Sequence, residues 1–174
     1  MSIKSRIRTI PHYPRKGIMF RDITTLLKDP VGLRTTIEEI VQRYQKEKIS
    51  KVAGIESRGF IIGAPVAYAL GAGFVPIRKQ GKLPAETIGC DYQLEYGFDK
   101  VEIHVDAIDK EDRVLLIDDL MATGGTMEAA IRLIRETGGS VVECCVVIDL
   151  PNAGGSRRLR QQGYQLFSLC SFED

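Results

Sequence analysis

The sequence has no apolar run long enough to cross a membrane and almost no excess of either charge. Its 24 lysines and arginines are balanced by 23 aspartates and glutamates, which leaves a formal net charge of +1. This balance gives no global electrostatic reason to expect nucleic acid or an anionic membrane as a partner, so any attraction for phosphate must be local. Residues 1–8 are too polar for a secretory signal peptide. We therefore expect a cytoplasmic protein that binds neither nucleic acid nor membranes.

Histidine and cysteine are also scarce, with two and four residues respectively. No two cysteines have C-x-x-C spacing and no histidine pair lies near them, so we expect no dedicated protein metal cluster. His12 and His104 lie too far apart in the sequence to suggest a catalytic pair. Cys144 and Cys145 are adjacent in a predicted strand, so one should face each side of the sheet. We interpret all four cysteines as reduced thiols.

The length of 174 residues, with 44% hydrophobic content, suits one well-filled core, and we expect a single domain spanning residues 1–174. Short apolar strands alternate with helical patterns along most of the chain. This alternation predicts an α/β fold with a doubly wound, mostly parallel central sheet flanked by helices. The predicted strands cover residues 51–55, 74–77, 114–117, 140–150 and 164–172, and the predicted helices cover 29–48, 60–70, 127–138 and 153–162.

Two segments lie outside this alternation. Residues 1–16 are basic and contain two prolines, so we expect them to wrap the domain without forming a core element. Residues 86–108 predict a β-hairpin, whose arms cover 90–95 and 101–105, because apolar and polar residues alternate there. An excursion of this kind between two sheet strands is a plausible lid over a site. A further stretch, residues 151–156, matches no catalytic motif and is expected to be structural.

Residues 114–127, VLLIDDLMATGGTM, contain the strongest functional pattern. Four aliphatic residues predict a buried strand, and Asp118 and Asp119 follow at the edge where open α/β sheets bind ligands. Residues 122–126, here named the phosphate loop, supply two glycines and two threonines before a helix, so backbone N–H groups can hold phosphate. No lysine follows the glycines as in the nucleotide P-loop. A sugar phosphate fits this combination, and the alternative is a sharp turn whose glycines serve geometry alone.

Two further segments suggest an anion site. The predicted strand 51–55 ends in Glu56-Ser57-Arg58-Gly59 before a helix, again a phosphate-binding arrangement in which Arg58 could be a ligand. Arg78, Lys79 and Lys82 follow the end of the next strand. Such cations usually form a solvated face, but the neighbouring candidate site favours an anion-binding role.

The strand followed by Asp-Asp and Thr-Gly-Gly-Thr resembles the central motif of the type I phosphoribosyltransferases. Residues 17–22, 56–60, 78–84 and 94–97 resemble, in order, further motifs of the adenine phosphoribosyltransferase family. This resemblance implies the type I phosphoribosyltransferase fold, with residues 1–30 as an N-terminal base-binding hood and residues 79–108 as the hairpin lid. It also implies transfer of a phosphoribosyl group from phosphoribosyl pyrophosphate to adenine, which forms AMP and pyrophosphate in purine salvage.

The resemblance implies a role for each matching residue. The 5′-phosphate and ribose would contact Asp118, Asp119, Ala122, Thr123, Gly124, Gly125 and Thr126. Pyrophosphate would contact Ser57, Arg58, Arg78, Lys79 and Lys82. Adenine would lie against Met19, Phe20, Arg21 and Leu120. The catalytic residues would be Glu95, Tyr96 and Arg58, with Glu95 as the general base for the adenine N9 proton, although both lid residues could instead serve only to stabilise the hairpin.

Three further properties follow from the resemblance. A magnesium cofactor would be held mainly by substrate oxygens, which suits the preference of Mg²⁺ for water and phosphate ligands. A homodimer is implied, because the arginine that matches Arg78 can reach across a subunit interface in this family. A non-proline cis peptide bond would fall at Ser57–Arg58.

Two alternative functions stay open. A 6-oxopurine phosphoribosyltransferase would share the central motif, since backbone recognition of a base leaves little trace in side chains. A regulator that binds phosphoribosyl pyrophosphate without turning it over is less favoured. Purine regulators of this fold carry a DNA-binding domain, and fewer than twenty residues precede Met19 here.

Overall fold

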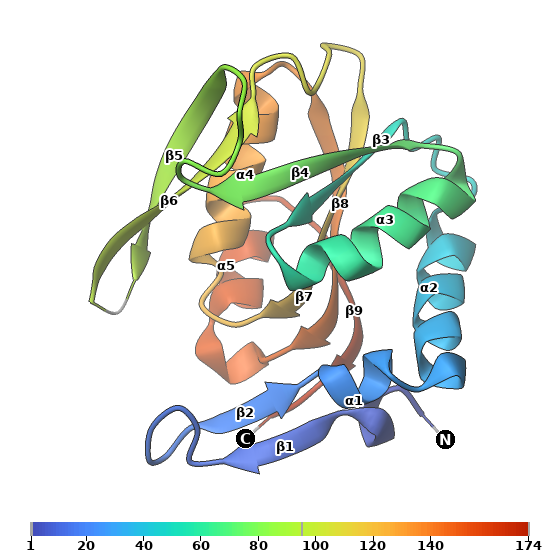
Figure 1. Ribbon diagram of the computed structural model, residues 1–174, viewed down its shortest axis with the longest axis vertical. Helices are drawn as coiled ribbons and strands as arrows, with labels where there is room; N and C mark the ends of the chain where they lie inside the picture. The colour runs from blue at the N-terminus through green and yellow to red at the C-terminus, as the bar shows by residue number, and fades with distance from the viewer. Residues whose placement is uncertain (1, 95, 174) are drawn as a thin grey trace.

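The computed structural model describes residues 2–94 and 96–173. Within these residues the central sheet has seven strands in the order β5-β6-β4-β3-β7-β8-β9 (Figure 1). Strands β4, β3, β7, β8 and β9 are parallel, and β6 runs antiparallel to β4 and β5. The bounds are β3 Lys51–Ile55, β4 Gly73–Lys79, β5 Thr87–Leu94, β6 Gly97–His104, β7 Arg113–Met121, β8 Ser140–Asp149 and β9 Leu166–Ser171. The predicted α/β class with a mostly parallel sheet is confirmed.

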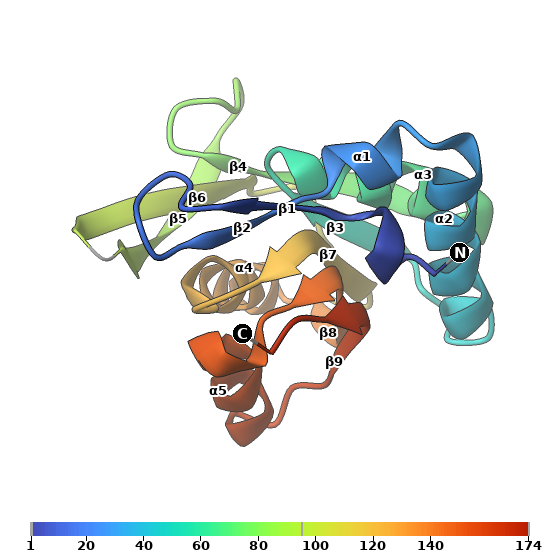
Figure 2. The ribbon, with the colours of Figure 1, turned by 90° about the horizontal axis from the view of Figure 1, so that it is seen from below.

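Helices cover both faces of this sheet (Figures 1 and 2). Helices α2 (Pro30–Tyr44) and α3 (Arg58–Leu70) bury their apolar sides in one core cluster, together with the short α1 (Thr24–Leu27). Helices α4 (Gly125–Glu136) and α5 (Gly155–Gln161) contribute to a second cluster on the opposite face. Cys144 belongs to the second cluster and Cys145 to the first, as the alternation of strand side chains predicts, and neither is in a disulfide. None of the described helices is long and apolar enough to span a bilayer.

Strand β7 lies at the centre of both cores. Val114 and Leu116 point into one core cluster and Leu115 and Ile117 into the other, and all four are fully buried. The strand is longer than predicted, because pairing with β8 continues through both aspartates to Met121. Asp118 and Asp119 are therefore held by the sheet itself instead of by the loop that follows it.

Helix α2 begins where predicted and ends earlier than predicted. The Asp29 side chain caps it by accepting a hydrogen bond from the Val31 N–H at 3.1 Å, with Pro30 at the first helical position. The expected end near Lys48 is wrong, because α2 ends at Tyr44 and Lys48 has a φ of +51°. The chain must turn here to enter β3.

The N-terminal segment contributes to the core, contrary to expectation. Ile3 and Ile7 flank the 3-10 helix η1 (Lys4–Arg6), and both are buried against the cluster that contains α2 and α3. Strand β1 (Arg8–Pro11) then pairs antiparallel with β2 (Met19–Asp22) in a small separate sheet, seen at the bottom of Figure 1. The sequence did not indicate this burial, because Ile3 and Ile7 are isolated apolar residues among polar and basic neighbours.

The predicted hairpin is an extension of the central sheet. Strands β5 and β6 pair from Thr87↔His104 to Leu94↔Gly97, and β6 pairs with the end of β4. In Figure 1 the hairpin projects from the edge of the sheet that lies beyond β4. Toward its far end the hairpin lies against the start of α4, since a Cβ atom on Gly125 would come 3.4 Å from the Gln93 carbonyl oxygen and 3.5 Å from the Tyr92 ring.

Candidate active site

Two adjacent carboxylates lie near the carboxyl end of β7, as predicted. Asp119 is buried and accepts a hydrogen bond from the Arg58 Nε–H, while its own backbone N–H donates to Asp118 Oδ1 at 2.8 Å. Burial raises the pKa of Asp118 well above its ordinary value, and the neighbouring Asp119 carboxylate raises it further. Asp118 therefore retains a proton more readily than a free aspartate. Such a pair can both accept hydrogen bonds from a ligand's hydroxyl groups and donate to their oxygens.

The phosphate loop connects β7 to α4 in a tight turn. Gly124 has a φ of +86°, which residues with a side chain rarely adopt, and α4 begins at the next residue. A helical hydrogen bond runs from the Glu128 N–H to the Gly124 carbonyl at 3.0 Å, so the N–H groups that precede it have no partner inside the helix. A cavity of about 120 Å³ is lined by Asp118 and residues 120–127. The structure thus brings the first aspartate and the whole phosphate loop around one small space.

Arg58 lies beside this pair because helix α3 begins unusually close to β7. A Cβ atom on Gly59 would lie 2.9 Å from a β7 carbonyl oxygen and 3.2 Å from Asp118 Oδ1, so a larger residue would push the helix away. Burial lowers the pKa of Arg58, but the carboxylates of Asp119, Asp118 and Asp22 more than offset this effect and raise it. The hood residue Asp22 is therefore close enough to act on the same guanidinium group.

Glu56 follows β3 directly and forms hydrogen bonds with Arg78 and Lys79 at the end of β4. Its carboxylate accepts hydrogen bonds from the Lys79 backbone N–H at 2.8 Å and from two Arg78 guanidinium nitrogens at 3.3 Å. The sequence analysis did not predict this contact, although a carboxylate at the end of one predicted strand and cations at the end of the next were a usable signal. The cis peptide bond joins Glu56 to Ser57, so the expected position at Ser57–Arg58 is wrong by one residue. The reason is that α3 already begins at Arg58, and the chain reverses directly after β3.

The three expected cations do not all lie on one side of β4. Successive side chains of a strand point to opposite faces. Lys79 Nζ contacts the Asp99 carboxylate and the Tyr92 hydroxyl of the hairpin, whereas the Arg78 Nη1–H donates to the Lys82 carbonyl at 3.2 Å. Arg78 and Lys82 therefore lie together, while Lys79 ties the hairpin to β4.

The residues expected to hold the base come from two elements, β2 with Met19, Phe20 and Arg21, and β7 with Leu120. The Phe20 ring packs edge-on against Tyr13 with the ring centroids 5.2 Å apart. The Arg21 guanidinium lies 4.1 Å from the centroid of the Phe172 ring near the C-terminus. Leu120 lines the phosphate-loop cavity.

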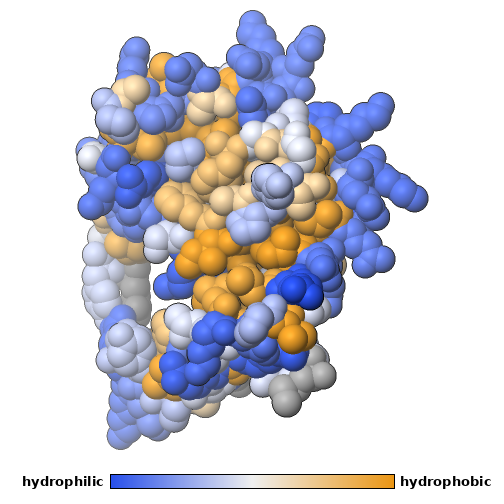
Figure 3. Space-filling view, turned by 45° about the vertical axis from the view of Figure 1, so that its right-hand side comes forward, coloured by the Kyte–Doolittle hydropathy of each residue, from blue (hydrophilic) through white to orange (hydrophobic). Residues whose placement is uncertain are grey.

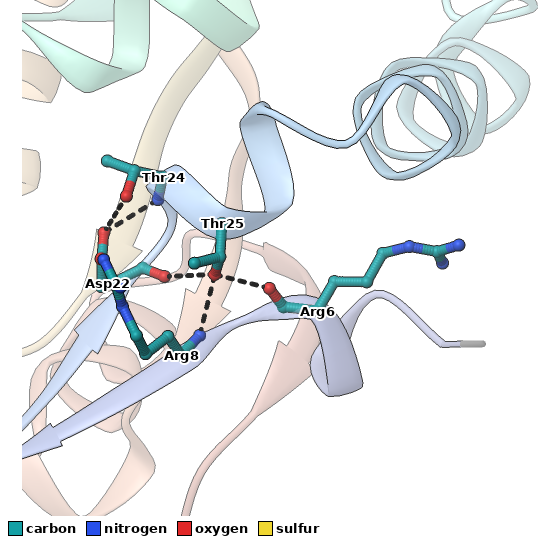
Figure 4. Close-up of polar contacts among 5 residues, drawn as sticks. All are labelled: Arg6, Arg8, Asp22, Thr24 and Thr25. Carbon is teal, nitrogen blue, oxygen red and sulfur yellow. Dashed lines mark hydrogen bonds and ion pairs between the residues drawn. The ribbon is translucent and has the colours of Figure 1, made fainter.

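A hydrogen-bond network fixes the junction between β2 and α1 (Figure 4). Asp22 accepts from the Thr24 hydroxyl at 2.7 Å, from the Thr24 N–H at 2.9 Å and from two nitrogens of Arg8. These bonds lower the pKa of Asp22 from 3.8 to about 2, with Thr24 contributing most. Thr25 Oγ1 accepts from the Arg8 N–H and donates to the Arg6 carbonyl, so it joins η1 and β1 to α1.

The tip of the hairpin contacts the hood. The Arg15 Nη1–H donates to the Tyr96 hydroxyl at 2.6 Å, and the Arg15 guanidinium lies 5.0 Å from the centroid of the same ring. Tyr96 is otherwise 75% exposed. The expected general base, Glu95, lies outside the described residues. The hood and the hairpin therefore meet through Arg15 and Tyr96.

Comparisons with known proteins agree with this arrangement. The family model of the phosphoribosyl transferase domain matches residues 23–170. The adenine phosphoribosyltransferase of Nitrosomonas europaea is 85% identical over 174 residues, which cover all of both chains. The solved structure of adenine phosphoribosyltransferase from Rhodothermus marinus is 49% identical with a TM-score of 0.91, and the match covers 98% of this chain and 96% of that one.

A second solved structure includes a base analogue. The APRTase of Giardia lamblia, complexed with 9-deazaadenine, is 38% identical with a TM-score of 0.93, and the match covers 100% of this chain and 99% of that one. High identity over whole chains and a shared fold support the same conclusion as the ordered motifs. The chain belongs to the adenine phosphoribosyltransferase family.

Proposed function

We propose that the chain transfers the phosphoribosyl group of phosphoribosyl pyrophosphate to adenine and forms AMP and pyrophosphate. The observation that best supports this proposal is the cavity at the end of β7, which Asp118 and the phosphate loop line together. A phosphoribosyl group has the matching chemistry, since it presents a phosphate and two adjacent hydroxyls on one sugar.

The phosphate loop is proposed to hold the 5′-phosphate through its N–H groups and its two threonine hydroxyls. Asp118 and Asp119 then face the ribose hydroxyls. The negative charge beside the ribose is proposed to come from the Asp119 carboxylate, which contacts the Arg58 guanidinium group. That negative charge stabilises the positive charge that develops at the anomeric carbon as its bond to pyrophosphate breaks.

The leaving pyrophosphate is proposed to lie against the Ser57 turn, with Arg58, Arg78 and Lys82 around it. Arg58 and Arg78 each contact a carboxylate in this structure. Binding of pyrophosphate therefore requires these guanidinium groups to share or exchange partners, which their five N–H donors permit. Lys79 can join them only by leaving its contacts in the hairpin.

Magnesium is the proposed cofactor. The residues described by the structure contain no group of three or more His, Cys, Asp or Glu side chains that could hold a metal ion. Asp118 and Asp119 are adjacent carboxylates, and Asp119 already contacts Arg58. This arrangement suits an ion that is held mainly by substrate oxygens and water, with no more than one of the two aspartates as a protein ligand. When bound, the ion supplies positive charge that makes pyrophosphate a better leaving group.

Adenine is proposed to stack between Phe20 of the hood and Leu120 of β7. Backbone groups of Met19 and Arg21 would read the purine edge, which needs few polar side chains. The adenine N9 bonds to the anomeric carbon and loses its proton to Glu95, the proposed general base. The contact between Arg15 and Tyr96 holds the hairpin tip at the hood, where the base is expected.

We also infer that two copies form a homodimer through the outer face of α3. Ile61 and Tyr68 on this helix are 48% and 90% exposed, and Ala64 and Pro65 between them are exposed as well. Figure 3 shows apolar residues gathered over the middle of the side on which α2 and α3 lie. A helix that is apolar on all sides is normally buried, so a second copy would cover this face.

The test is AMP formation from adenine and phosphoribosyl pyrophosphate with magnesium, run beside hypoxanthine, guanine and xanthine. We expect turnover of adenine alone, and a loss of about a hundredfold or more in kcat for Glu95→Ala. Turnover of a 6-oxopurine would contradict the choice of base. Tight binding of phosphoribosyl pyrophosphate without turnover would support a regulator instead. A cytoplasmic location also stays a prediction.

A further inference from the structure

The segment that leads into α5 packs directly against the phosphate loop. The Gly155 N–H donates to the Ala122 carbonyl at 3.0 Å. A Cβ atom on Gly155 would overlap that oxygen and lie 2.7 Å from the Gly124 nitrogen. This contact joins backbone to backbone and leaves no room for a side chain. Residues 151–156 are thus next to the candidate site, although they match no catalytic motif.

Arg158 makes two more contacts at the same place, about one helical turn further along α5. Its Nη2–H donates to the Thr123 carbonyl at 2.6 Å, and its Nε–H donates to Glu128 Oε1 at 2.5 Å. Glu128 belongs to the first turn of α4. One guanidinium group therefore holds both the phosphate loop and the helix that follows it.

These contacts fix the direction of two peptide groups. In a trans peptide the C=O and the N–H point to opposite sides of the chain. The carbonyls of Ala122 and Thr123 are bound to Gly155 and Arg158. The N–H groups of the next residues, Thr123 and Gly124, must then point away from α5, where they are available to an anion.

Arg158 also neutralises a charge that works against phosphate binding. The carboxylate of Glu128 lies in the first turn of α4, and its side chain is only 15% exposed. The N-terminus of a helix attracts anions, so an unpaired carboxylate here would compete with a phosphate and repel it. The ion pair with Arg158 removes most of that repulsion.

We propose that Arg158 is a positioning residue for the 5′-phosphate, which acts through the Thr123 carbonyl and the Glu128 carboxylate without touching the substrate. This inference rests on the proposed function, in which the phosphate loop binds the 5′-phosphate. Helix α5 thereby contributes to substrate affinity. The effect of Arg158 is expected on binding of the 5′-phosphate end of the substrate and not on binding of the pyrophosphate end.

The experiment measures binding of ribose 5-phosphate and, separately, of pyrophosphate by calorimetry, together with KM for both substrates in the turnover assay. The variants are Arg158→Gln, Arg158→Lys, Glu128→Gln and the double variant Arg158→Gln/Glu128→Gln. Arg157→Gln is the matched control, because Arg157 is an exposed arginine on the same helix that forms no ion pair in the described part of the chain. Thermal unfolding of each variant reports whether it is folded.

For Arg158→Gln we expect Kd for ribose 5-phosphate and KM for phosphoribosyl pyrophosphate to rise about tenfold, with pyrophosphate binding and KM for adenine within about twofold. Arg158→Lys should weaken ribose 5-phosphate binding about threefold. An ammonium group can pair with Glu128, but it lacks the planar guanidinium fork that also reaches the Thr123 carbonyl. In the Glu128→Gln background the loss from Arg158→Gln should shrink, since no carboxylate is left unpaired.

Two results would separate the inference from the proposed function. Equal ribose 5-phosphate binding by Arg158→Gln, Arg158→Lys and Arg157→Gln, with an active wild type, would overturn the role of Arg158 alone. If a folded Arg158→Lys protein loses affinity equally for ribose 5-phosphate, pyrophosphate and adenine, the positioning role of Arg158 is overturned as well. A wild-type protein that neither binds ribose 5-phosphate nor forms AMP would instead contradict the proposed function.

Discussion

Replacing Asp22 with asparagine tests whether the network at the end of β2 stabilises the hood. The Asp22 carboxylate accepts two hydrogen bonds from Thr24 and two from Arg8, and its pKa is lowered from 3.8 to about 2. At about 1.4 kcal/mol for each pKa unit, this shift corresponds to roughly 2.5 kcal/mol of folding free energy. The Arg8 side chain is 56% exposed, so solvent screening reduces the expected contribution to about 1 to 1.5 kcal/mol.

The sign of the pH dependence follows from the direction of the shift. Because the pKa of Asp22 is lower in the folded protein, its stabilisation is fully present above about pH 4 and is lost as the pH falls toward 2. Urea unfolding followed by circular dichroism suits this protein, which has no tryptophan. The exposed Asp106 provides the control variant Asp106→Asn.

At pH 7 we expect Asp22→Asn to be about 1 to 1.5 kcal/mol less stable than Asp106→Asn, and at pH 2.5 we expect less than half of that difference. A difference that is the same at both pH values would show that the charge of Asp22 is not the cause. No difference at pH 7 would refute the stabilising role of the network altogether.

Two further variants test the site and the proposed dimer. Gly59→Ala places a Cβ atom 2.9 Å from the Ile117 carbonyl oxygen and should lower kcat/KM by about tenfold or more. The control Gly73→Ala meets only the Lys51 side chain and should leave kcat/KM unchanged. Equal activity of the two variants would contradict the need for close packing of α3 on β7. Tyr68→Glu should reduce the mass in sedimentation to that of one chain, whereas Val105→Glu on the hairpin should leave a dimer; a wild-type monomer would refute the interface.

The parts of the fold that were predicted from sequence are those with a local pattern of apolar residues, either an unbroken run or a regular spacing. Residues 114–117 are four consecutive aliphatics, which occur where a strand is covered on both faces, and they are fully buried. Helix α4 has apolar residues at helical spacing, namely Met127, Ala130, Ile131 and Ile134, and all four are buried in the core cluster against which the helix packs. Such patterns are local, so a single sequence suffices to detect them.

The errors occurred where a distant contact decides the local structure. Ile3 and Ile7 are single apolar residues in a basic segment, and only the core around α2 and α3 explains their burial. The expected pyrophosphate contact of Lys79 stays a prediction, but nothing in the sequence indicated the contact that its side chain makes in the structure. The alternation of β4, together with Asp99 twenty residues later, turns its side chain toward the hairpin.

The supports of the phosphate loop were missed for a different physical reason. Gly155 and Arg158 act on the carbonyl groups of Ala122 and Thr123, and a carbonyl group is present at every position whatever the side chain. A motif therefore records which residues form the loop but not which residues hold its peptide groups in place. Because that orientation decides how many N–H groups face the phosphate, substitutions in α5 should change substrate affinity while the Asp-Asp and Thr-Gly-Gly-Thr pattern stays intact.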